Sequence, residues 1–123
     1  MSTPRATVYR WSDRPTDSPM PLLERQRIIG EHAMISRVLL KKGFVLQTHA
    51  HANEQFGMVL SGRITFGLGA DNAPNRTHQT LGPGEVIHFP GNFPHSAEAL
   101  EDTLILDIFS PPSEKTGIDA PRS

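Results

Sequence analysis

Apolar and polar residues alternate in short runs along most of this chain, and glycine, proline and asparagine separate the runs. Alternation with a period of two is typical of β-strands that bury one face. No long window combines the 3.6-residue period of an amphipathic helix with a cap and a stop. The pattern therefore predicts nine strands, at residues 26–29, 33–41, 44–49, 55–61, 63–68, 77–81, 85–89, 95–100 and 103–109.

The sequences between these strands are suited to tight turns, for example Lys42-Gly43, Ser61-Gly62 and Pro83-Gly84. Many short strands at even spacing are typical of a sandwich or barrel. We therefore expect an all-β barrel over residues 26–112. Residues 1–25 are expected to form an irregular proline-rich arm and the first edge strand, and residues 113–123 a loose tail.

Composition narrows the class of protein. A chain of 123 residues and 13.6 kDa is large enough for one domain with a real core. The net charge of −1, without a basic stripe, argues against a nucleic-acid partner. Cysteine is absent, which excludes disulfides and thiolate metal sites. Without an apolar signal segment or membrane span, the expected location is the cytoplasm.

Three histidines and an amide carry the candidate chemistry. His49 and His51 stand two residues apart on a predicted strand, so both imidazoles face one side. Gln55 begins the next strand, and His95 follows a rigid turn bounded by two prolines. Imidazole is the commonest protein ligand for transition metals. A single buried histidine is usually a core residue, but the joint arrangement predicts a site for one divalent metal: Ni, Zn, Fe, Mn or Cu.

The spacing of these residues resembles the two motifs of the cupin superfamily. The first motif is matched at Gly43, His49, His51, Gln55 and Gly62, with five, one, three and six residues between them. The resemblance implies a double-stranded β-helix (jelly-roll) barrel with the metal inside. Glutamate is usual where this chain has glutamine. An amide removes one negative charge from the ligand set, so a bound metal is expected to be a stronger Lewis acid.

The second motif is matched at Gly84, Pro90 and His95, with Asn92 where glycine is usual and Ala99 where asparagine is usual. Neither departure falls on a ligand. The two motifs and the closing strand are similar to small cupins of pectin and alginate breakdown, which linearise 4,5-unsaturated uronates. In that group the metal ligands match His49, His51, Gln55 and His95. The group's closing-strand acid and aromatic residues match Asp107 and Phe109.

Further residues are candidates for catalysis and substrate binding. Asp107 interrupts an apolar strand, so it is either solvated at an edge or faces a polar cavity, where it acts as an acid or base. Arg37 carries a planar fork suited to a substrate carboxylate, although an exposed strand arginine also fits. The expected pocket is completed by Phe109, Met58 and His88.

Three functions compete at this point. The leading hypothesis is an enzyme that opens the ring of an unsaturated uronate, in which the metal binds the substrate carboxylate and Asp107 moves a proton. The second is a metal-dependent dioxygenase acting on a small polar substrate, and the third is a non-catalytic cupin that binds or senses a small ligand. In each case the partner is a small molecule, and a homodimer is expected.

Overall fold

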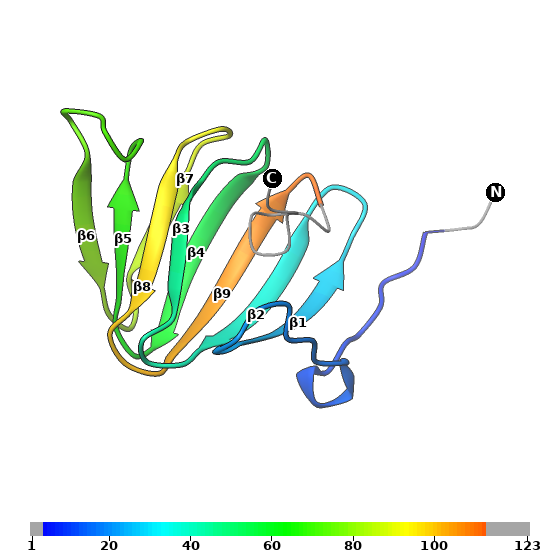
Figure 1. Cartoon of the computed structure of the whole chain (residues 1–123). Helices are drawn as coiled ribbons and strands as arrows, with labels where there is room; N and C mark the ends of the chain where they lie inside the picture. Colours follow the sequence, from blue (N-terminus) through cyan, green and yellow to red (C-terminus); the bar gives the residue numbers. More distant parts are fainter. Residues whose placement is uncertain (1–3, 113–123) are drawn as a thin grey trace.

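The computed structural model describes residues 4–112 and places nine strands within them, arranged in two antiparallel sheets. The two sheets lie face to face with the core between them (Figure 1). The five-stranded sheet has the order β1 (Leu23–Ile29), β2 (Met34–Leu40), β9 (Thr103–Ser110), β4 (Glu54–Ser61) and β7 (Val86–Phe89). The four-stranded sheet has the order β3 (Val45–His49), β8 (His95–Ala99), β5 (Ile64–Leu68) and β6 (Thr77–Leu81).

The predicted all-β jelly-roll fold is confirmed, and each of the nine predicted strands has a counterpart in the structure. The largest difference concerns β1, which begins at Leu23, three residues before its predicted start at Gln26. The expected boundary between arm and barrel after residue 25 therefore falls inside this strand. The tail predicted for residues 113–123 lies outside the described residues.

Alternation along the strands builds the core. In β2 the buried positions are Met34, Ser36, Val38 and Leu40, and the residues between them face outward. The middle strand β9 repeats the pattern, and the register pairs Val38 with Ile105. The largest fully buried side chains are apolar apart from one threonine: Phe89, Leu23, Met34, Ile64, Val38, Val59 and Thr103. Burial of this apolar face is the main term that holds the two sheets together.

Gly62, in the predicted turn after β4, shows why the turn chemistry matters. Its φ of +89° lies in the left-handed region that side chains disfavour. A Cβ added there would also lie 2.3 Å from the carbonyl oxygen of Asp102. Glycine at this position therefore allows the chain to turn tightly against the start of β9.

The N-terminal arm crosses the open edge of β1. It contains one 3₁₀ turn, η1 (Trp11–Asp13), and the residues before it extend away from the sheets (Figure 1). The Gln26 amide of β1 donates hydrogen bonds to the carbonyl oxygens of Trp11 (2.7 Å) and Arg14 (3.0 Å). The arm is thus attached to the edge strand by specific polar contacts. In the described part of the chain no helix has the length and apolar character needed to cross a membrane.

Candidate metal centre

The three predicted histidine ligands come together between the sheets at one end of the fold. His49 ends β3, His95 begins β8, and the two residues pair across the four-stranded sheet. His51 lies in the loop that leads into β4. Their ligand nitrogens all lie within 4.8 Å of one another, and they form the only such group in residues 4–112. This spacing allows the three imidazoles to share one cation.

A β-bulge directs His49 inward. Leu46 pairs with Ala97, and His49 pairs with His95, so β3 uses one residue more than β8 between the two pairs. Strict alternation would put Leu46 and His49 on opposite faces. Because the bulge inserts an extra residue, both side chains reach the interior.

Local hydrogen bonds fix the tautomer of each imidazole. The Nδ1 atoms of the histidines lie 2.8–3.0 Å from a backbone carbonyl oxygen two residues away, at Gln47, Asn53 and Phe93. A carbonyl oxygen only accepts, so each Nδ1 carries the proton and donates it. The Nε2 atom of each ring is then left with a lone pair for a metal. Such outer contacts orient ligating histidines and set which nitrogen binds.

The site also favours neutral imidazoles, which are the form that binds metal. Burial lowers the pKa of His95 to about 4, although the hydrogen bond to the Phe93 carbonyl opposes the shift. Burial likewise lowers the pKa of His49. The His95 ring is held by stacking on Phe89, with centroids 4.0 Å apart. The imidazoles of His49 and His95 are therefore neutral at neutral pH, with Nδ1 protonated.

Gln55 completes the ligand set from the five-stranded sheet. Its amide nitrogen donates to Asp107 Oδ1 at 3.1 Å, which turns the amide oxygen toward His51. That oxygen lies 3.1 Å from His51 Nε2. Since His51 is protonated on Nδ1, two lone-pair atoms face each other across this gap. A cation between them would resolve the contact, so the four residues present fit a divalent metal.

A profile of the cupin domain matches residues 36–109, more than half of the chain. The chain belongs to the cupin family. A search of curated protein sequences finds no match.

Solved structures resemble this cupin over most of its length. KdgF from Halomonas sp. is 25% identical, covers 89% of this chain and 97% of its own, and superposes with a TM-score of 0.79. An RmlC-like cupin from Shewanella frigidimarina is 20% identical, with a TM-score of 0.78 and coverages of 89% and 95%. A single-substitution variant of oxalate decarboxylase from Bacillus subtilis is 19% identical, with a TM-score of 0.77. The match covers 92% of this chain and 33% of the decarboxylase. The last two show the fold alone.

Metal-binding and enzymatic cupins are thus among these neighbours. The Bacillus subtilis oxalate decarboxylase is described with Mn(II) centres. Those properties belong to that protein, and for this cupin the likeness shows the fold; its candidate metal site rests on its own histidines.

The second motif of this cupin contains a residue in an unusual conformation. Asn92, which replaces the usual glycine, has a φ of +65°. Asparagine is one of the few residues that adopt this left-handed region readily. Its backbone N–H donates to the His51 carbonyl at 2.7 Å, which ties the turn before His95 to the loop that carries His51. The replacement therefore preserves the turn that places two ligands side by side.

Asp107 faces the interior beside the candidate ligands. Of the two interpretations of the sequence, a solvated edge or a polar cavity, this position matches the cavity. It pairs with Gly57 of β4, and a Cβ at Gly57 would lie 3.2 Å from Asp107 Oδ1. Glycine thus leaves space for the carboxyl group. Burial raises the pKa of Asp107 to about 7, and the Gln55 hydrogen bond partly opposes the shift. A carboxyl group with this pKa can give or take a proton near neutral pH.

Phe109 also lies inside, with its ring centroid 5.8 Å from that of His51 in an edge-to-face arrangement. A small cavity of about 40 Å³ reaches His49, Gln55, His95, Asp107 and Phe109 among its lining residues. The placement of Phe109 agrees with its expected position at the pocket.

Three other expected site residues are not in the interior. Met58 stands one residue out of phase with the inward-facing Gln55 and Gly57, so it lies on the outer face of β4. His88 also faces outward, where it stacks on Phe56 with centroids 4.6 Å apart and lies 2.6 Å from Glu54 Oε2. The pocket assignments of Met58 and His88 were therefore wrong, because strand alternation turns them outward.

Arg37 is the third correction. It lies between the buried Ser36 and Val38, on the outer face of β2, and donates to the Gln26 side chain at 3.2 Å. It cannot reach a substrate between the sheets, so the expectation that Arg37 is catalytic was wrong. The arginines that do face inward are Arg25 and Arg27 of β1, which sequence reasoning missed.

Proposed function

We propose that this cupin is a metal-dependent enzyme that opens the ring of a 4,5-unsaturated uronate. The observation that carries the proposal is Asp107, an acid with a pKa of about 7 that is hydrogen-bonded to the candidate ligand Gln55. The resemblance to KdgF, a cupin of uronate linearisation, supports this choice of substrate class.

The reaction requires a proton to move while one bond breaks. The hydroxyl hydrogen at C1 of the sugar is removed, the bond between C1 and the ring oxygen breaks, and C1 becomes an aldehyde. The ring oxygen keeps the electron pair as an enolate at C5, which becomes a ketone when C4 is protonated. No atom is gained or lost, so the reaction is an isomerisation.

The residues of this chain suit the separate parts of that reaction. A bound metal supplies a Lewis acid that stabilises negative charge on a substrate oxygen. His49, His51, Gln55 and His95 would hold it. Asp107 accepts the proton of the C1 hydroxyl and returns a proton to C4, and its pKa near neutrality suits both directions. The apolar ring of Phe109 limits water beside the carboxyl group.

The test is an absorbance assay. Protein loaded with Ni²⁺, Zn²⁺, Fe²⁺ or Mn²⁺ is incubated with a 4,5-unsaturated galacturonate, and loss of the conjugated enol-ether absorbance is followed. We expect acceleration over the metal-free protein, at an equal rate with and without oxygen. An equal rate with and without metal would remove the proposal, and an oxygen requirement would indicate the dioxygenase instead.

A further inference from the structure

The outer face of the four-stranded sheet carries a groove of about 470 Å³, a volume within the range of pockets that bind small molecules. All four strands line it, and the loop of residues 69–76 between β5 and β6 adds Asp71 and Arg76. Most of its other lining side chains are polar, among them Gln47, Thr48, Thr65, Ser96 and Glu98. None of the candidate metal ligands lines it, because His49 and His95 face the interior. The groove is therefore a site distinct from the metal centre.

A largely buried guanidinium group lies across this outer face. Arg76 is only 16% exposed; its Nη2 donates to Ser96 Oγ of β8 at 2.8 Å, and its Nη1 donates to the Gly69 carbonyl. Gly67 of β5 pairs with Ser96, and a Cβ added at Gly67 would collide with the Arg76 guanidinium group. Glycine inside a strand often marks the close approach of another group. The sequence thus leaves space for a fixed cation against β5 and β8.

Two carboxylates offset the charge of this guanidinium group. Asp71 accepts a hydrogen bond from the Thr48 hydroxyl of β3, and its Oδ1 lies 3.7 Å from Arg76 Nη1. Asp71 and Arg76 therefore hold the loop against β3 and β8. Glu98 is exposed on β8, and its side chain makes no hydrogen bond to another described residue. With two carboxylates beside one guanidinium group, the groove does not favour an anionic ligand.

Hydrogen-bond donors and acceptors remain available beside one another in the groove. The Ser96 oxygen accepts from Arg76, so the Ser96 O–H is left to donate. Arg76 has five N–H groups and uses two of them in the bonds above. The second oxygen of Asp71 and both oxygens of Glu98 can accept. A hydroxyl group donates and accepts, so a ligand rich in hydroxyls satisfies both kinds of group.

One apolar side chain adds to this polar lining. Val45 of β3 is 57% exposed and pairs with Glu98 of β8. A sugar ring has C–H groups on its faces and hydroxyls around its edge, which suits an apolar side chain with polar groups beside it. A wholly apolar ligand would instead remove the carboxylates and the guanidinium group from water without replacing their hydrogen bonds, which is costly.

We infer that this groove binds an uncharged sugar. Arg76 donates to hydroxyls of the ring, Asp71 and Glu98 accept from them, and Val45 contacts a C–H face. The inference is independent of the proposed function, because the groove contains neither Asp107 nor a candidate metal ligand. Sugar binding on this face adds a second ligand site to the cupin, behind the strand ends that carry His49 and His95.

A nuclear magnetic resonance titration tests the inference. Glucose, galactose, mannose and xylose are each added to ¹⁵N-labelled, Zn²⁺-loaded protein. At least one sugar should shift the amide signals of Thr65 and Ser96 in a saturable way and leave the signal of Asp107 in place. Glu98→Ala should weaken that sugar about tenfold, because a charged acceptor is lost from a residue that holds no other element. Glu101→Ala, at an exposed glutamate outside the groove, is the matched control and should keep wild-type affinity.

Arg76→Gln should also weaken the sugar about tenfold, with Arg63→Gln, at an exposed arginine outside the groove, as its control. If Arg76→Gln does not fold, Glu98→Ala decides, since the Glu98 side chain fastens no other described residue. Three outcomes overturn the inference: no shift at the groove with any of the four sugars, equal affinity in the wild type and Glu98→Ala, or tighter binding of galacturonate than of galactose at the groove. Turnover of the unsaturated uronate is measured separately, so either proposal can fail while the other stands.

Discussion

The four-stranded sheet contributes imidazoles to the space between the sheets, whereas the five-stranded sheet contributes an amide, a carboxyl group and two guanidinium groups. His49 and His95 belong to the first sheet. Gln55, Asp107 and Arg27 belong to the second. Two of the candidate metal ligands thus come from the four-stranded sheet, while the third imidazole lies in the loop before β4, and Gln55 and the proposed proton carrier come from the five-stranded sheet. Substitutions on the two sheets should therefore separate metal content from turnover.

The outer faces differ as well. Outward positions of the five-stranded sheet are largely apolar, and three of them are well exposed: Phe56 at 42%, Leu60 at 44% and Val86 at 52%. Outward positions of the four-stranded sheet are mostly polar and line a groove of about 470 Å³, with residues such as Gln47, Thr65, His78, Ser96 and Glu98. An apolar sheet face of this kind commonly marks an interface.

The largest effect is expected from His95→Ala. Removing one of three imidazoles should lower metal affinity more than about a hundredfold, so bound metal falls from about one equivalent per chain to near zero. Activity is lost with it. Metal analysis after gel filtration measures the change. His78→Ala, at an exposed outward position of the same sheet, should keep both metal and activity. A full equivalent of metal in His95→Ala would contradict the ligand assignment.

Asp107→Asn should do the opposite: retain the metal and lose turnover. The three imidazoles and the Gln55 oxygen remain, so metal content stays near one equivalent. Loss of the proton carrier is expected to lower kcat about 10²- to 10⁴-fold. Steady-state kinetics with the unsaturated uronate measures it, with the exposed Asp13→Asn as control. A variant with wild-type kcat would remove Asp107 from the reaction.

The same substitution has a predicted effect on the stability of the metal-free protein. The pKa of Asp107 is raised from 3.8 to about 7, so between these values the folded state holds a proton that the unfolded state releases. The free energy of unfolding of the wild type therefore falls as the pH rises through this window, because the buried carboxyl group resists ionisation. Thermal unfolding at about pH 5 and about pH 8 should show a smaller loss of stability in Asp107→Asn than in the wild type.

The contrast between outer faces predicts a homodimer through the five-stranded sheet. Leu106 lies on β9, the middle strand, between Arg37 and Met58. A glutamate there would bury two added charges in the interface, one from each chain, so Leu106→Glu should shift a dimer to a monomer of 13.6 kDa. Light scattering measures the mass. Thr80→Glu, on the polar sheet, should leave it unchanged. A wild-type mass near that of one chain would contradict the dimer.

The elements that sequence predicted best are those whose signal is local. All nine strands follow from alternation and turn residues, and the four candidate ligands follow from spacing. The bulge that turns His49 inward was not predictable, because it depends on how β3 pairs with β8. Met58 shows the reverse case: its phase relative to Gln55 already placed it on the outer face, and the pocket assignment disregarded that phase.

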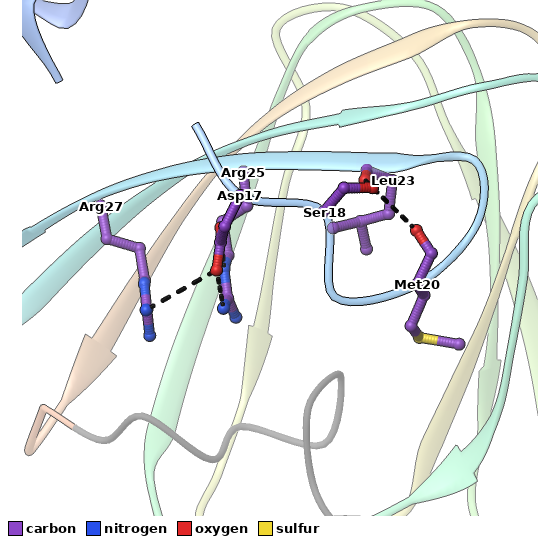
Figure 2. A network of polar contacts seen from close by, with 6 residues as sticks. All are labelled: Asp17, Ser18, Met20, Leu23, Arg25 and Arg27. Carbon is purple, nitrogen blue, oxygen red and sulfur yellow. Dashed lines mark hydrogen bonds and ion pairs between the residues drawn. The ribbon is translucent and has the colours of Figure 1, made fainter. Parts of the chain in front are cut away.

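The inward orientation of Arg25 and Arg27 on β1 lay beyond sequence reasoning for a different reason. Residues 24–27 are Glu-Arg-Gln-Arg, so both faces of this strand are polar. Alternation of apolar and polar residues therefore could not indicate which face is buried. What orients Arg25 is a contact with Asp17, in an arm that carries no periodic signal (Figure 2). Arg37 was the more visible arginine, because it interrupts an apolar strand. The inward face of a polar edge strand can thus be identified only when the segments that contact it are known.

The smallest effect is expected where the arm joins the five-stranded sheet, at Asp17. Hydrogen bonding to Arg25 lowers the pKa of Asp17 below 3.8, so the folded state favours the ionised form. That stabilisation is complete above the ordinary pKa and is lost as the pH falls through the lowered value. Asp17 is about half exposed, so solvent screens the contact and the change in melting temperature should be small. Asp17→Asn should flatten the acid limb of the unfolding curve, measured by circular dichroism below about pH 4, whereas Asp13→Asn should not. An unchanged acid limb would show that the arm contributes nothing to the stability of β1.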